Sequence, residues 1–128
     1  MISMEKEEPK LPQADMSVSR QISFTRPVTT IAPATQTIVA DDCPVTGKIT
    51  YITLHFPDGC NALVELSCSV NQEQILPVSG FIALNNATKD FPVNMKVTKK
   101  SALRVLIVNR DAINPHTPSI IFNLEGVP

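Results

Sequence analysis

Apolar and polar residues alternate one by one over much of the chain beyond residue 35, and this period of two constrains the fold more than any other feature. In the run from Ala62 to Val70, the even-numbered residues are apolar and the odd-numbered ones, apart from Leu63, are polar. This pattern puts the apolar side chains on one face of a strand, whereas an amphipathic helix has a period of 3.6 residues. No stretch follows the helical period convincingly. The sequence therefore predicts an all-β fold in which each sheet buries one face.

Turn residues divide this region into seven or eight short strands. We expect strands at residues 37–40, 48–56, 62–70, 81–84, 91–97 and 103–108, and a last one through Ile120, Phe122 and Leu124. The polar stretch 71–74 is expected to end the strand that precedes it. Strands of this number and spacing are typical of an antiparallel β-sandwich. Jelly-roll connectivity is the preferred interpretation, and an immunoglobulin-like order stays open.

One predicted strand lacks the alternation. Residues 103–108 are apolar on both faces apart from Arg104. Such a strand is expected at the centre of a sheet, covered by the opposite sheet on one side. Its other side would be covered by the N-terminal residues or by a partner.

The first 35 residues differ in composition from the rest. They contain no glycine and few large apolar residues, and they include four prolines and the charged cluster Glu5-Lys6-Glu7-Glu8. Such a segment buries too little apolar surface to offset the entropy lost on ordering. We therefore predict two parts, an extended N-terminal arm over residues 1–35 and a β-sandwich domain over residues 36–128.

Within this arm, one stretch alternates as a strand does. Met16, Val18, Ile22 and Phe24 are separated by polar residues, with Arg20 on the apolar side. An extended peptide of this kind can add as a strand to the sheet of a neighbouring molecule. These five residues are the predicted partner-binding site. An unstructured tail whose alternation arises by chance is the alternative.

Charge and hydropathy argue against several classes of partner. The net charge is −1, and neither the arm nor the domain has the basic excess of a nucleic-acid-binding protein. The longest apolar runs are only about four residues, too short to cross a membrane, and no secretory signal is recognisable at the N-terminus. We expect no nucleic-acid or membrane partner and synthesis in a cytoplasm. The three cysteines lack metal-ligand spacing and are expected to be free thiols, with Cys68 on a buried face.

No group of residues has the spacing of a catalytic or metal site, so neither enzymatic activity nor a cofactor is predicted. His55 lies on the polar face of a strand without a nucleophile or acid at motif spacing. His116 lies beside Asp111 in a proline-bounded loop and could join it in a metal or ligand site, but two potential ligands are too few, so we expect His116 to stiffen the loop. Asp41 and Asp42 are considered as calcium ligands but are interpreted as solvated turn residues.

A carbohydrate-binding or other ligand-binding module is the alternative function. Aromatic rings on which sugars stack are scarce, because the chain has no tryptophan and one tyrosine. Tyr51 and His55 share one strand face, and they form the alternative ligand site together with His116 in the 109–118 loop.

Several segments together resemble the small β-sandwich structural proteins of tailed phages and related viruses. They are Phe56-Pro57-Asp58-Gly59-Cys60, Leu63-Val64-Glu65-Leu66, Ile75-Leu76-Pro77, Phe81-Ile82-Ala83-Leu84, Leu103-Arg104-Val105-Leu106-Ile107-Val108-Asn109 and Pro115-His116-Thr117. The resemblance covers roughly residues 36–126 and contains no diagnostic motif.

This resemblance implies a role in a virion, such as that of a capsid decoration or cement protein, and it brings no catalytic residues. The expected function is therefore that of a non-enzymatic structural protein, located in the virion after synthesis in the host cytoplasm. Its expected partners are capsid subunits and copies of itself, in a homo-oligomer or bound to the capsid lattice. The arm fits this expectation, because cement proteins commonly reach across subunit boundaries with extended termini.

Overall fold

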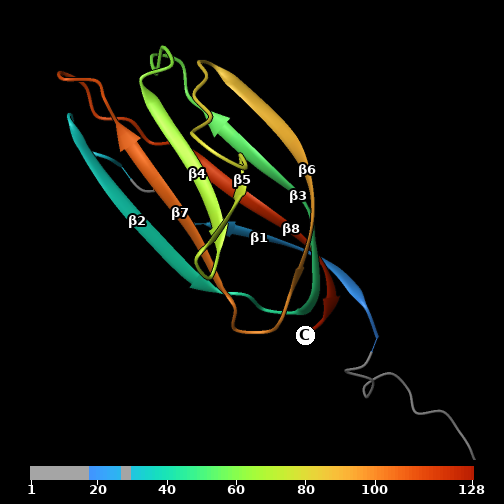
Figure 1. The fold of residues 1–128 in the computed structure, drawn as a ribbon. Coiled ribbons are helices and arrows are strands. Elements are labelled where there is room, and N and C mark those ends of the chain that lie inside the picture. The colour runs from blue at the N-terminus through green and yellow to red at the C-terminus, as the bar shows by residue number, and fades with distance from the viewer. Residues whose placement is uncertain (1–17, 27–29) are drawn as a thin grey trace, which may run out of the picture.

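The fold is known from a computed structural model, which describes residues 18–26 and 30–128. The described residues form two four-stranded antiparallel sheets packed face to face, without a helix (Figure 1). The strands are β1 (Arg20–Arg26), β2 (Thr35–Asp42), β3 (Thr46–Phe56), β4 (Val64–Val70), β5 (Glu73–Leu76), β6 (Ala87–Val97), β7 (Ala102–Asn109) and β8 (Ser119–Val127). The prediction of an all-β antiparallel sandwich is confirmed. Residues 18–26 and 30–128 contain no helix that is long and apolar enough to cross a membrane.

The strand order is β1-β8-β3-β6 in the first sheet and β2-β7-β4-β5 in the second. Strands therefore pair first with last, second with seventh, third with sixth and fourth with fifth, always antiparallel. The chain behaves as one long hairpin rolled up so that its strands pass from sheet to sheet. This order is that of an eight-stranded jelly roll, so the preferred connectivity is confirmed.

The core lies between the two sheets and contains the inward-facing apolar residues of four strands. They are Ile52, Leu54 and Phe56 of β3, Val64, Leu66 and Cys68 of β4, Leu103, Val105 and Ile107 of β7, and Ile120, Phe122 and Leu124 of β8, all at most 2% exposed. Burial of a side chain of this size stabilises the fold by about 1.5–3 kcal/mol. In β3, β4 and β8 these are the residues that the alternation places on one face, whereas in β7, which is apolar on both faces, the fold selects them.

The sandwich begins earlier than the expected boundary at residue 36. β1 pairs with β8 over its whole length, from Arg20 opposite Gly126 to Arg26 opposite Ile120. Ile22 and Phe24 are partly buried and pack against the core. The physical reason is that β8 would otherwise be an edge strand with one row of unpaired backbone groups.

Two further segments differ from the sequence prediction. The polar stretch after β4 does not end the pairing, because a two-residue turn at Asn71 and Gln72 returns the chain as the short strand β5. Asn71 has a positive φ of 56°, which asparagine tolerates in such a turn. The strand expected at 81–84 is reduced to one bridge, in which Ile82 exchanges hydrogen bonds with Leu66 of β4.

Candidate functional site

The jelly-roll order brings four connections to one end of the sandwich. They join β1 to β2, β3 to β4, β5 to β6 and β7 to β8, and their described residues are 30–34, 57–63, 77–86 and 110–118. We call these residues the loop end. The opposite end carries the short turns between β2 and β3, β4 and β5, and β6 and β7, and we call it the turn end.

Backbone hydrogen bonds tie the loops of the loop end to one another. Ile31 and His116 each donate their amide to the carbonyl of the other, at 2.8 and 3.2 Å, and so join the first loop to the last. The amide of Arg110 donates to the carbonyl of Leu63 at 2.7 Å, and so joins the last loop to the loop between β3 and β4. These contacts hold segments that are far apart in the sequence in one arrangement.

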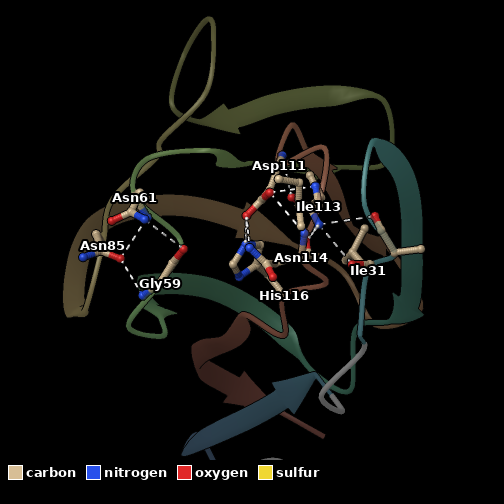
Figure 2. Close-up of polar contacts among 10 residues, drawn as sticks. Ile31, Gly59, Asn61, Asn85, Asp111, Ile113, Asn114 and His116 are labelled. Atoms are coloured by element: carbon tan, nitrogen blue, oxygen red, sulfur yellow. Dashed lines mark hydrogen bonds and ion pairs between the residues drawn. The ribbon is translucent and has the colours of Figure 1, made fainter.

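The centre of this arrangement is a buried pair, Asp111 and His116 (Figure 2). Nε2 of His116 lies 2.8 Å from Oδ2 of Asp111, and the amides of Ile113 and Asn114 donate to Oδ1 at 2.9 and 3.1 Å. The hydrogen bond from His116, helped by these two amides, lowers the pKa of Asp111 well below its ordinary value of 3.8. The ionised carboxylate can only accept, so Nε2 of His116 carries the donated proton. This geometry agrees with the expected stiffening of the loop.

Asn109 links this pair to the loop that precedes β2. Its side-chain amide donates to the carbonyls of Ile31, Ala32 and Asn114 at 3.1, 3.3 and 3.0 Å. Its Oδ1 accepts from the amide of Asp111 at 2.9 Å. The residue is only 1% exposed, and its one side chain satisfies four backbone groups, those of Ile31 and Asp111 through fully buried bonds.

A second polar cluster fixes the neighbouring loops. Oδ1 of Asn85 accepts from the amides of Gly59 and Asn61 at 3.0 and 2.8 Å, as Figure 2 shows. Gly59 has a φ of 99°, a conformation that other residues rarely adopt. The loop between β5 and β6 is thereby held against the loop between β3 and β4.

Large apolar side chains protrude from these fixed loops. Leu63 is 38% exposed, Val78 86%, Phe81 42% and Ile113 80%. Ile113 follows Asp111 by two residues, and its amide is held by that carboxylate. The loop end therefore combines a rigid backbone with exposed apolar groups, an arrangement that suits docking to a protein surface.

The loop end has little of what chemical catalysis requires. His116 is buried, and its Nε2 is bonded to Asp111. Burial, followed by the charges of Asp111 and Asp58, raises the pKa of the Cys60 thiol, which is the opposite of what an activated nucleophile needs.

The five residues predicted to bind a partner are divided by the structure. Met16 lies outside the described residues, Val18 is 49% exposed, and Arg20 is exposed at the start of β1. Ile22 and Phe24 are half-buried and pack against the core of their own chain instead of a neighbour's sheet. Val18 and Arg20 stay predicted partner-binding residues.

The three residues of the alternative ligand site are not brought together. Tyr51 and His55 lie on the outer face of β3, as predicted, and Tyr51 is 40% exposed. Nδ1 of His55 lies 2.7 Å from the hydroxyl of Thr88 on β6. His116 is buried in the loop end, away from this exposed face.

A polar depression of about 410 Å³ lies beside Tyr51. It forms where Thr50 is an extra residue of β3 relative to β8, between Ile49 and Tyr51. Asn123 of β8 lines it, and its side chain accepts from Ser23 of β1 at 3.0 Å and donates to Thr53 of β3 at 3.2 Å. A continuous row of hydrogen bonds thus crosses three strands of the outer face.

A larger cavity of about 700 Å³ lies at the turn end, between β6 and the turn that joins β4 to β5. Val70, Met95 and Val97 supply its apolar part, and Glu73 and Lys96 are among its polar lining residues. It contains none of the residues that the sequence predicts as functional.

The remaining sequence candidates occupy ordinary structural positions. Cys43, Cys60 and Cys68 are buried free thiols, and burial raises the pKa of Cys68 to about 12. Asp41 and Asp42 lie at the end of β2 and not in a turn. Among residues 18–26 and 30–128, no three histidine, cysteine or acidic side chains lie close enough together to hold a metal ion.

Comparisons with known proteins bear on the fold alone. No protein-family model matches the chain, and no curated protein matches its sequence. A solved structure described as the crystal structure of FLHE is similar, with a TM-score of 0.51 over 82% of this chain and 96% of that one. The two chains are 12% identical, so the similarity shows a shared sandwich architecture and carries no function with it.

Proposed function

We propose that this chain is a non-enzymatic structural protein of a virus particle that docks on neighbouring capsid subunits through its loop end. The observation that carries the proposal is the exposure of Ile113 and Val78 on loops held by hydrogen bonds. The amide of Ile113 donates to Asp111, and the side chain of Gln74 donates to the carbonyls of Pro77 and Gly80 on either side of Val78. A preformed apolar surface loses little conformational entropy on binding, and this favours association with a protein. The virion setting comes from the sequence resemblance, with which an eight-stranded jelly roll is compatible.

The segment before β1 supplies a second contact in this proposal. Fully extended, residues 1–17 would reach roughly 55 Å from the domain, far enough to touch a neighbouring subunit. Val18 and Arg20 are exposed where this segment joins the sandwich. Deletion of residues 1–17 leaves all eight strands in place and is therefore the appropriate truncation.

The test uses particles of the encoding virus produced without this gene. Purified full-length chain is added to them, and co-sedimentation is measured as a function of concentration. The double variant Ile113→Asp, Val78→Asp should bind at least tenfold more weakly, because truncating an interface anchor commonly costs 1–3 kcal/mol. Tyr51→Ala, which changes an exposed residue of the β3 face, should bind as the wild type does. Absence of binding, or undiminished binding by the double variant, would contradict the proposal.

The depression beside Tyr51 favours one second candidate, a carbohydrate-binding module. An exposed aromatic ring next to polar side chains suits a sugar, which stacks one face on the ring and hydrogen-bonds at its edge. A glycan array probed with and without calcium tests it. A reproducible hit that Tyr51→Ala abolishes would favour this function over docking on a capsid. An array on which no glycan binds would rule out carbohydrate binding.

A further inference from the structure

Two four-stranded sheets have four edge strands, and here they are β1 and β6 in the first sheet and β2 and β5 in the second. An edge strand presents unpaired backbone groups with which another chain can pair. Natural proteins protect such edges with short strands, prolines, lysines and bulges. The four edges of this sandwich differ in whether they carry these devices.

Three edges are protected. β6 contains Pro92, two lysines and a bulge near Asn94, whose φ is 90°. β5 has only four residues. β1 begins with the exposed charged residue Arg20, and charged side chains protect an edge strand.

The remaining edge, β2, carries no such protection over Thr35–Asp42. It contains no proline, lysine or arginine, and it pairs with β7 over all eight residues without a shift in register. Figure 1 shows β2 at the margin of its sheet, beyond β7. At its middle, the apolar side chain of Ile38 is 54% exposed.

We propose that two copies of this chain pair antiparallel along β2, about a two-fold axis perpendicular to the sheet at Ile38. The second sheets of the two copies then form one continuous sheet of eight strands. This interaction surface is independent of the capsid-binding function proposed above, because it needs no particle.

Side-chain direction determines the register. Directly opposed residues of an antiparallel pair point to the same face of the sheet. With Ile38 opposite its own counterpart, Gln36 lies opposite Ala40, and outward side chains of one copy meet outward side chains of the other. Leu106 of β7 is the register partner of Ile38, so an apolar row of two leucines and two isoleucines crosses the joined sheet.

Charge also favours the antiparallel arrangement. Asp41 and Asp42 lie together at one end of β2. In the proposed register Asp41 lies opposite Thr35, so the acidic ends of the two copies lie apart. Parallel pairing would place the two acidic ends side by side, where like charges destabilise the pair.

Disulfide trapping tests the register. In Ile38→Cys the two introduced residues face each other, with Cα atoms about 4.5–5.5 Å apart, which is within the range of a disulfide. In Gln36→Cys the two introduced residues are four positions apart, at least about 13 Å along the strands. The native thiols are at most 1% exposed and do not compete.

Under mild oxidation by glutathione disulfide, the Ile38→Cys protein should run as a dimer on a non-reducing gel, and the Gln36→Cys protein as a monomer. Mixing Gln36→Cys with Ala40→Cys should give a cross-linked heterodimer. Failure of Ile38→Cys to cross-link, or equal cross-linking of Gln36→Cys alone, would refute the proposed pairing.

Sedimentation velocity of the full-length wild type tests the association itself. One strand pair buries less than a standard interface of about 1,600 Å², so a dissociation constant on the order of 10–100 μM is expected. Ile38→Lys should weaken dimerisation at least thirtyfold, whereas Val78→Lys, at an even more exposed apolar residue of the loop end, should not. A wild type that stays monomeric at 500 μM would refute the dimer. If deletion of residues 1–17 abolishes the association, that segment and not a second β2 strand binds the β2 edge. This result would refute the pairing of two β2 strands.

Discussion

Asn109 is the residue whose removal should most weaken the loop end. Substitution by alanine deletes three donated hydrogen bonds and one accepted bond, two of them fully buried. At about 1–1.5 kcal/mol for each buried bond and about 0.5 kcal/mol for each partly solvated one, the loss is roughly 3 kcal/mol. For a domain of this size, this corresponds to a fall in melting temperature of about 10 °C.

The assay is urea unfolding at pH 7. The chain has no tryptophan, so the signal is the far-ultraviolet circular dichroism of the strands. The midpoint should fall while the slope stays unchanged, because the core is not altered. Hydrogen exchange should show faster exchange of the Ile31 and His116 amides, which bond to each other across the loops that Asn109 joins.

Gln72→Ala is the matched control, because it removes an exposed amide from the turn between β4 and β5. Such a surface change should alter the free energy of unfolding by less than about 0.5 kcal/mol. If Asn109→Ala also loses less than 1 kcal/mol, the four hydrogen bonds do not stabilise the loop end as we argue.

Three further predictions concern other parts of the fold. The lowered pKa of Asp111 means that its contribution to stability is present above the ordinary value of 3.8 and is lost as the pH falls below it. The difference in urea midpoint between wild type and Asp111→Asn should therefore be large at pH 7 and shrink towards pH 2; an equal difference at both values would contradict this reasoning. In Gly47→Ala, the added methyl group would lie 2.0 Å from the carbonyl oxygen of Glu125, a backbone atom that cannot move aside easily. The melting temperature should therefore fall by more than about 5 °C. An unchanged melting temperature would show that β3 and β8 can separate without cost. Deletion of residues 1–17 should leave the melting temperature unchanged. Deletion of residues 1–26 removes β1 and should lower the free energy of unfolding in urea by on the order of 3–5 kcal/mol. Similar stability of the two truncated proteins would argue against a structural role of β1.

The period of two was sufficient to predict the core residues of β3, β4 and β8 but not the first strand. Alternation in Val64 to Val70 determines which side chains face inward, whatever strands lie beside them. The same alternation in residues 16–24 predicts a strand but not its neighbour. Its partner β8 is about 100 residues away in sequence, with Ser23 opposite Asn123. Pairing over such a separation leaves no local signal, so a strand of the domain was assigned to a separate arm.

The loop end was only partly accessible from sequence. The sequence places Asp111 and His116 in one loop but does not predict their hydrogen bond. The role of Asn109 depends on carbonyl groups of residues 31 and 32, which only the fold brings near. One local signal was available. Aspartate and asparagine are typical of tight turns, and Asp111 and Asn114 lie on either side of Ile113. An isolated apolar residue in such a turn is expected to point into solvent.

The pairing of the first and last strands has a practical consequence for protein engineering. Arg20 lies opposite Gly126, so residues 18–20 and the stretch after Val127 emerge next to each other at the turn end. A short linker between them should give a circularly permuted chain with a new opening in one of the loops. If the loop end rests on a particle, the turn end points away from it. A peptide or enzyme fused after Pro128 would then be displayed outward at regular spacing, and the chain would serve as an adaptor for decorating the particle surface.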